Sequence, residues 1–347
     1  MKVLVTGANG FIGSNLVKAL LNKGYKVRAF VRKTSDLRSL EGLKVELAYG
    51  DILEPETITE ALKGCEILFH VAGVFSYWGY DSNELISNAK HGMQNIMEAV
   101  SKSKIKRVVL TSSSVTLGST KNKRIISEEN PGDFDDSPAY VISKVEQEKL
   151  AFQLAGLYNI DLVVVNPTLT VGGPDYGLTE SNHMIVNYLK DLFKTTWIGG
   201  CNIVSVDDVA EGHIIAAEKG VRGEKYILGS ENLEWSEVHS IISELSGLPG
   251  PYVTAYYTSA FLASAFHELI STFTGEAPSS SRDQAKMVGH YYWYNHNKIR
   301  KLGFSPKSAK AALTAVVSWL AGSEHIPASI RATMELSSQI HNYRNGI

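Results

Sequence analysis

Met1-Lys-Val-Leu-Val-Thr-Gly-Ala-Asn-Gly-Phe-Ile-Gly-Ser14 opens the chain and decides its fold. An apolar run typical of a buried strand meets a turn in which Gly7, Gly10 and Gly13 are three residues apart, and a helical pattern follows. Glycine at these places lets the backbone bend, a pyrophosphate approach the amides and the helix pack on the strand. The helix start adds free N–H groups. The stretch predicts a dinucleotide-binding loop, and a glycine-rich turn without a ligand is the alternative.

The composition is that of a globular enzyme-sized chain. It has 347 residues, 44% of them hydrophobic and 20% charged, with a net charge of −2 when histidine is neutral. This length suffices for one large core or for a domain with a smaller lobe. Because the sequence shows no basic stripe, we expect no nucleic-acid partner. Cys65 and Cys201 form no metal-type cluster, so no metal is expected. They are interpreted as reduced thiols of a cytoplasmic protein, and a disulfide between them is the alternative.

No segment has the pattern of a signal peptide or of a membrane span. The N-terminal apolar run is about three residues long and enters the glycine turn at once. The most apolar long stretch, 252–270, contains His267 and Glu268 and falls short of a transmembrane helix. We expect a helix of a second lobe there, and contact with a membrane surface is the alternative.

Apolar strand patterns alternate with helical patterns along the first half of the chain. This order predicts an α/β fold with a doubly wound parallel Rossmann sheet, in which ligands bind beyond the carboxyl ends of the strands. The predicted nucleotide-binding domain is 1–170 plus about 200–229, with a strand at 203–206 returning to it. About 171–199 and 230–325 should form a smaller, mostly helical substrate lobe, and 326–347 a polar tail.

A second motif, Tyr140-Val-Ile-Ser-Lys144, falls near the start of a predicted helix. A spacing of four places the phenol and the ammonium group on one helical face. The nearby cation should favour the phenolate, lowering the pKa of Tyr140 so that it can exchange protons near neutral pH. Ser113, at the end of a predicted strand, could hydrogen-bond a carbonyl oxygen. His70, at another strand end, is interpreted as structural.

These motifs together resemble those of the extended short-chain dehydrogenase/reductases. The resemblance covers about residues 1–322 and is carried by several segments, namely Thr6 to Gly13, Gly50-Asp51-Ile52, His70-Val-Ala-Gly73, Thr111-Ser-Ser113, Tyr140 with Lys144, Asn166-Pro167, 206–210 and 226–229. Within the family the chain looks most like the dihydroflavonol 4-reductase-like branch. The resemblance implies that Tyr140 is the acid/base, that Lys144 holds the ribose and tunes Tyr140, and that Ser113 orients the carbonyl group.

Ser112, Ser113 and Ser114 are consecutive, so which of them is the catalytic serine depends on how the segment is aligned with the family pattern. Alignment of 110–118 with the family pattern places the catalytic residue at Ser113, which leaves Ser112 and Ser114 as structural residues. A shift of the register by one residue is the alternative.

The second predicted strand ends in Arg32-Lys33, where an NAD-preferring site usually carries an acid. A guanidinium group pairs with a 2′-phosphate, which an acid would repel. We therefore expect NADP(H), with Arg32 as the contact; two solvated basic residues are the alternative. The predicted cofactor-binding residues are Gly7, Asn9, Gly10, Phe11, Ile12, Gly13, Arg32, Asp51, Ile52, Val71, Ala72, Gly73, Thr111, Tyr140, Lys144, Pro167 and Thr170.

The predicted function is reduction of a ketone or aldehyde by NADPH. The substrate is expected to be a small apolar or aromatic molecule near Phe75, Tyr77, Ser113 and Tyr140, with more aromatic surface from 252–257 and 291–294. The same scaffold carries 3β-hydroxysteroid-type dehydrogenases and nucleotide-sugar 4-epimerases. Arg282, Lys286 and Lys298 keep the nucleotide-sugar alternative open.

Two further expectations concern partners. The alternative to an enzyme is a regulator that senses a dinucleotide without catalysis. The presence of Ser113, Tyr140 and Lys144 together argues against it. Relatives often dimerise, and the resemblance suggests a homodimer through helices 84–101 and 138–158.

Overall fold

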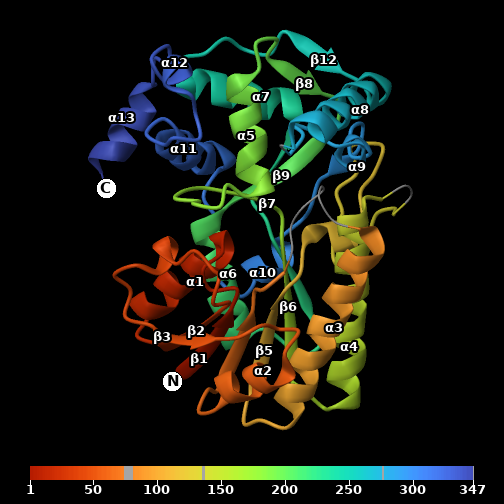
Figure 1. The fold of residues 1–347 in the computed structure, drawn as a ribbon, viewed down its shortest axis with the longest axis vertical. Helices are drawn as coiled ribbons and strands as arrows, with labels where there is room; N and C mark the ends of the chain where they lie inside the picture. Colours follow the sequence, from red (N-terminus) through yellow and green to blue (C-terminus); the bar gives the residue numbers. More distant parts are fainter. Residues whose placement is uncertain (74–80, 135–136, 276, 347) are drawn as a thin grey trace.

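The computed structural model describes residues 1–73, 81–134, 137–275 and 277–346, and its centre is a seven-stranded parallel sheet (Figure 1). Every neighbouring pair in this sheet runs parallel. Its strands, in spatial order, are β10 (Lys225–Leu228), β6 (Leu162–Pro167), β5 (Arg107–Thr111), β4 (Ile67–His70), β1 (Lys2–Thr6), β2 (Lys26–Val31) and β3 (Glu46–Tyr49). The order confirms the doubly wound α/β fold expected from the sequence.

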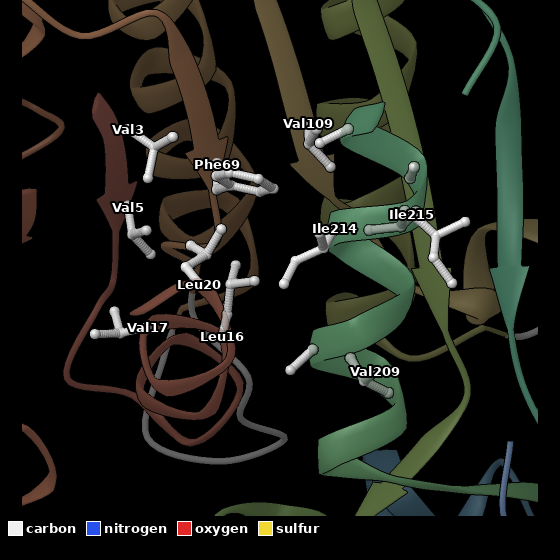
Figure 2. Packing of buried hydrophobic residues seen from close by; sticks show 14 of the residues in the cluster. Val3, Val5, Leu16, Val17, Leu20, Phe69, Val109, Val209, Ile214 and Ile215 are labelled. Atoms are coloured by element: carbon white, nitrogen blue, oxygen red, sulfur yellow. The ribbon is translucent and has the colours of Figure 1, made fainter. Parts of the chain in front are cut away.

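Helices cover both faces of this sheet, which explains why its central strands are apolar without alternation. One face carries α1 (Phe11–Asn22) and α6 (Val206–Lys219), and the other carries α2 (Pro55–Leu62), α3 (Ser82–Ser101) and α4 (Ala139–Leu157). Figure 2 shows Leu16 and Leu20 of α1 lying between the strands and Ile214 of α6. The strand ends of the main sheet are thereby fixed against a closely packed core.

The second lobe combines small sheets with helices. One sheet has the order β11 (Glu231–Glu234), β9 (Gly200–Ser205) and β13 (Tyr291–Tyr292), with β7 (Leu169–Val171) also paired to β9, and β12 (Val253–Ala255) pairs with β8 (Thr195–Trp197). Its core lies among α5 (Glu180–Lys190), α7 (Trp235–Ser246), α11 (Ala309–Leu320) and α13 (Ser338–Asn345). The remaining helices are α8 (Tyr257–Thr274), α9 (Arg282–Ala285), α10 (Asn297–Arg300), α12 (Ala328–Arg331) and the 3₁₀ turns η1 (Arg38–Leu40) and η2 (Ser114–Leu117).

Two segments differ from expectation. The strand expected at 203–206 to return to the main domain is β9, which joins the second sheet instead, and only from Val206 does the chain re-enter the main domain as α6. The tail expected at 326–347 is anchored, because Ile326 and Ile340 are fully buried in the second-lobe core. The boundaries proposed for the two lobes stay a prediction.

The helix expected within 252–270 is α8. Among the residues that the structure describes, none of the helices combines the length and the apolar character needed to cross a lipid bilayer.

Three histidines, one in each of β4, α6 and α7, are buried to 2% exposure or less. Burial lowers the pKa of His70 to about 3, of His213 to about 4 and of His239 to about 3. In the unfolded chain these histidines become protonated below about pH 6.5. In the folded chain burial keeps them neutral until the pH falls to about 4 or lower, so protonation favours the unfolded state. Stability should therefore fall as the pH drops through this window.

The expected loss of unfolding free energy between pH 7 and pH 5 is roughly 2 kcal/mol for each of these histidines. Urea unfolding at the two pH values measures it. The variant His239→Phe, which removes one titrating group, should lose a smaller amount over the same interval. An unfolding free energy that is equal at both pH values would contradict the assignment of these side chains as buried neutral imidazoles.

Candidate active site

One cavity of about 1480 Å³ begins at the carboxyl ends of β1, β4, β5 and β6 and extends along the second lobe. It brings together the predicted site residues that the structure describes. These are Gly7, Asn9, Gly10, Phe11, Ile12, Gly13, Arg32, Asp51, Ile52, Val71, Ala72, Gly73, Thr111, Ser113, Tyr140, Lys144, Pro167 and Thr170. Phe75 and Tyr77, predicted near the substrate, lie outside the described residues.

The glycine loop between β1 and α1 leaves no room for side chains. Gly7 has φ 63°, and a Cβ there would lie 2.8 Å from the backbone of Ala72. A Cβ on Gly13 would lie 2.1 Å from the carbonyl oxygen of Gly7. Since α1 begins at Phe11, its first amides have no acceptor within the helix. A bare backbone with free N–H groups beside the cavity fits the pyrophosphate of a dinucleotide.

His70 contacts the residue that precedes this loop, Thr6. Its Nδ1 lies 2.8 Å from the hydroxyl oxygen of Thr6, which also accepts hydrogen bonds from the amides of Val71 and Ala72, both at 3.2 Å. The contact ties the end of β4 to the end of β1. His70 is fully buried, and its structural role stays a prediction.

Arg32 follows β2 and lies beside the cavity. It is exposed and lines the cavity, whereas the neighbouring Lys33 does not. The acid that comes soonest after it, Asp36, is paired with Arg38 at 2.6 Å and lies outside the cavity lining. The charge that faces the cavity from the end of β2 is therefore positive.

Tyr140 and Lys144 lie in the first turns of α4 and face the end of β5. Burial raises the pKa of Tyr140 to about 12, and a hydrogen bond with Ser113 opposes this rise. Burial lowers the pKa of Lys144 to about 8, and the charge of Glu148 opposes this change. The expectation that Lys144 lowers the pKa of Tyr140 is wrong in this structure, because desolvation of the phenolate by burial raises that pKa.

The three serines after β5 have different partners. Ser112 donates to a carboxylate oxygen of Glu148 at 2.5 Å and is buried. Ser114 hydrogen-bonds Tyr294. Ser113 is half-buried, caps the start of η2 and hydrogen-bonds Tyr140. This geometry favours the register that places the reactive hydroxyl at Ser113.

Glu148 was not recognised in the sequence, yet it joins the elements around the site. One of its oxygens accepts from Ser112, from Thr116 at 2.8 Å and from Asn166 Nδ2 at 2.8 Å, and its other oxygen lies 3.1 Å from Lys225 Nζ. A buried carboxylate with this many donors is held rigidly. The signal available was its position four residues beyond Lys144, on the same face of α4.

Aromatic side chains from distant segments line the second-lobe side of the cavity. Tyr292 and Tyr294 were among the expected aromatics, whereas Tyr188, Trp197 and Trp235 were missed because only the tertiary fold brings them to the cavity. The expected contributors Tyr252, Tyr256 and Tyr257 are exposed instead and do not line it.

The basic residues that kept a nucleotide sugar open are engaged elsewhere. Arg282 pairs with Glu268 at 2.6 Å, Lys286 with Asp283 at 3.2 Å and Lys298 with Glu224 at 2.5 Å. The cavity takes its lysine and arginine side chains, within the described ranges, from Arg32, Lys144 and Lys190.

A parallel sheet with a glycine loop at the carboxyl end of its first strand, beside a cavity that holds a serine, a tyrosine and a lysine, defines a Rossmann-type dinucleotide enzyme. The model of the NAD dependent epimerase/dehydratase family matches residues 3–229. The chain belongs to this family, and within it to the extended short-chain dehydrogenase/reductases of the dihydroflavonol 4-reductase-like branch.

Similar proteins cover nearly the whole chain. A Synechocystis sp. protein that carries dihydroflavonol 4-reductase as a provisional name is 33% identical over 91% of this chain and 93% of its own length. Cinnamoyl-CoA reductase 2 of Arabidopsis thaliana is 31% identical over 94% of each chain. The crystal structure of gox2253 superimposes with a TM-score of 0.82 at 32% identity, covering 94% of this chain and 99% of that one. A nicotinamide dinucleotide is thus the cofactor of the family to which this chain belongs.

Proposed function

We propose that the protein is an NADPH-dependent reductase acting on a ketone or aldehyde of a small apolar or aromatic molecule. The observation that carries the proposal is the single cavity lined by Ser113, Tyr140 and Lys144 at one place and by the glycine loop and Arg32 at another. A redox cofactor held by the loop would have its reactive end within reach of a proton donor.

The residues that would hold NADPH are those of the glycine loop, Arg32 and Lys144, and the cofactor when bound supplies a hydride. Tyr140 remains a phenol at neutral pH because burial raises its pKa, so it can donate a proton as negative charge develops on the carbonyl oxygen. Ser113, hydrogen-bonded to Tyr140, orients the same oxygen. Lys144 places a positive charge beside them at or below neutral pH, since its pKa of about 8 keeps it protonated there.

The lining of the cavity supports an apolar or aromatic substrate. Tyr188, Trp197, Trp235 and Tyr292 offer flat apolar surface. The engagement of Arg282, Lys286 and Lys298 in ion pairs argues against a site for a sugar pyrophosphate. The name of the relative cinnamoyl-CoA reductase agrees with an aromatic carbonyl substrate.

NADPH oxidation over a panel of ketones, aldehydes, sterols and nucleotide sugars tests the proposal. We expect turnover with aromatic or apolar carbonyl compounds and none with nucleotide sugars. Oxidation of a 3β-hydroxysteroid with NADP⁺ would support the dehydrogenase alternative. Bound cofactor without turnover on any compound, in the wild type and in Tyr140→Phe alike, would indicate a regulator.

Cofactor preference gives a separate prediction. Arg32→Asp should shift the ratio of kcat/KM for NADPH over NADH by about 100-fold towards NADH, because a charge-assisted contact with the 2′-phosphate becomes a repulsion. Kinetics with both cofactors measure this ratio. Lys33→Asp makes the same change of charge one residue further from the cavity and should leave the ratio nearly unchanged. An equal response of the two variants would remove Arg32 from the site.

Location and assembly complete the proposal. Cys65 and Cys201 are both buried free thiols, which supports a cytoplasmic location. The homodimer suggested by the family resemblance would pack α3 and α4, which lie side by side on one face of the main sheet.

A further inference from the structure

Helix α8 is inverted relative to an ordinary surface helix: its polar side faces the protein and its apolar side faces outwards. Ser264, Glu268 and Ser271, at spacings of four and three, are buried. Glu268 accepts from the side chain and the backbone amide of Arg282 at 2.6 and 2.7 Å, and the hydroxyls of Ser264 and Ser280 lie 2.9 Å apart. These polar contacts fix the orientation of the helix on the second lobe, so that its apolar face is left outside.

The outward face carries a continuous apolar stripe. Leu262, Phe266, Leu269 and Phe273 follow one another at spacings of four, three and four, and are 65%, 61%, 54% and 83% exposed. Single exposed apolar residues are common on globular proteins, whereas a contiguous stripe of large ones marks an interaction surface.

Further exposed apolar residues lie near β8 and at the start of β12. Leu192 and Phe193 are 90% and 70% exposed, and Tyr252 and Val253 are exposed beside them, since the amide of Tyr252 donates to the carbonyl of Lys194 at 3.1 Å. We refer to these eight residues together as the apolar rim: Leu192, Phe193, Tyr252, Val253, Leu262, Phe266, Leu269 and Phe273. Figure 1 shows α8 beside β8 and β12 at the edge of the second lobe.

The apolar rim shares two residues with the lining of the active-site cavity. Phe193 and Val253 belong to the rim and also line the cavity, and the cavity is lined further by Ala260 and Ala263 of α8. An object resting on the rim would therefore reach the cavity lining at Phe193 and Val253. A fluid apolar phase in contact with these two residues could pass an apolar substrate to the cavity.

Charge and residue type point to the same occupant. The sequence has no lysine, arginine, aspartate or glutamate from Leu245 to His267, so this side of the rim offers no ion pairs to a protein partner. Phenylalanine and leucine on one helix face, with tyrosines at its start, are the residues that enter the interface of a bilayer.

We propose that the apolar rim inserts into the surface of a lipid bilayer and brings the cavity-lining residues Phe193 and Val253 against it, so that an apolar carbonyl compound enters from the lipid. Docking depends only on the rim, and the route of the substrate rests on the proposed reductase function. The tyrosines Tyr256 and Tyr257, at the start of α8, would lie at the headgroup level.

Sedimentation of the full chain with phosphatidylcholine vesicles tests the docking. The wild type should co-sediment, and Phe266→Ser with Phe273→Ser should lower the partition coefficient by at least about tenfold, since each buried aromatic group is worth that factor or more. Added phosphatidylserine or salt should change little, because the rim carries no charge. Leu157→Ser with Val221→Ser, which removes exposed apolar residues elsewhere, is the matched control and should bind as the wild type does.

Two results would overturn the proposal: no wild-type binding to the vesicles, or a dimer in solution that the substitutions at Phe266 and Phe273 convert to monomer, which would make the rim an interface between two copies. Circular dichroism and thermal melting of the variants show whether they fold. Vesicle binding is measured without turnover, so a reductase assay that fails on every carbonyl compound would remove the proposed function without altering the outcome for docking.

Discussion

Tyr140→Phe is expected to reduce turnover by about 10²–10⁴-fold, the range that general acid catalysis contributes. The substitution removes one oxygen atom and keeps the aromatic ring, which is buried. A carbonyl oxygen that gains negative charge would then lack its proton donor, while Ser113 could still orient it. Because the glycine loop and Arg32 are untouched, binding of NADPH should be close to that of the wild type.

Steady-state kinetics and a fluorescence titration of NADPH separate the two expectations. Tyr292→Phe is the informative comparison, because Tyr292 lines the same cavity and burial likewise raises its pKa to about 12. Turnover close to that of the wild type in Tyr140→Phe, with the loss appearing in Tyr292→Phe, would transfer the acid role to Tyr292.

Gly13→Ala is expected to abolish cofactor binding and to destabilise the fold by roughly 3 kcal/mol. The new methyl group would lie 2.1 Å from the carbonyl oxygen of Gly7, and no side-chain rotation can relieve this contact because the Cβ position is set by the helix backbone and its partner is a backbone atom. The start of α1 would have to move away from β1, and this is the place where the free amides of the helix meet the cavity. Stability and binding should therefore fall together.

Gly156→Ala provides the matched control for this prediction. Gly156 lies near the end of α4, is exposed, and a Cβ there would meet no atom within 4 Å. Alanine should leave NADPH binding unchanged and stabilise the helix by a few tenths of a kcal/mol up to about 1 kcal/mol. Urea unfolding and NADPH titration of the two variants give the comparison, and a Gly13→Ala protein that still binds NADPH normally would disprove the close packing of the loop.

Local patterns made the main sheet predictable. The glycine loop requires only a strand, three glycines and a helix that are adjacent in the sequence. The buried parallel strands can be predicted because each is a run of apolar residues. The pair Tyr140 and Lys144 was accessible in the same way, because one helix carries both residues.

Features that depend on the tertiary fold could not be predicted from these patterns. Whether β9 pairs with β7 and β11 or enters the main sheet is decided by packing between distant segments. The pKa of Tyr140 was predicted in the wrong direction because spacing reveals the neighbouring Lys144 but not the depth of burial. Glu148 was missed because its partners are far apart in the sequence: Ser112 follows β5, Asn166 lies in β6 and Lys225 in β10.

The passage of the chain from β9 directly into α6 has a consequence for synthesis on the ribosome. The face of the main sheet that α1 shares with α6 is completed by Val209, Ile214 and Tyr226, so it stays uncovered until more than half of the chain has emerged (Figure 2). Strand β10, at the edge of the main sheet, follows later still and pairs with β6. The nascent nucleotide-binding domain must therefore wait for β7, α5, β8 and β9 to be made, which leaves its apolar surface to chaperones during that interval.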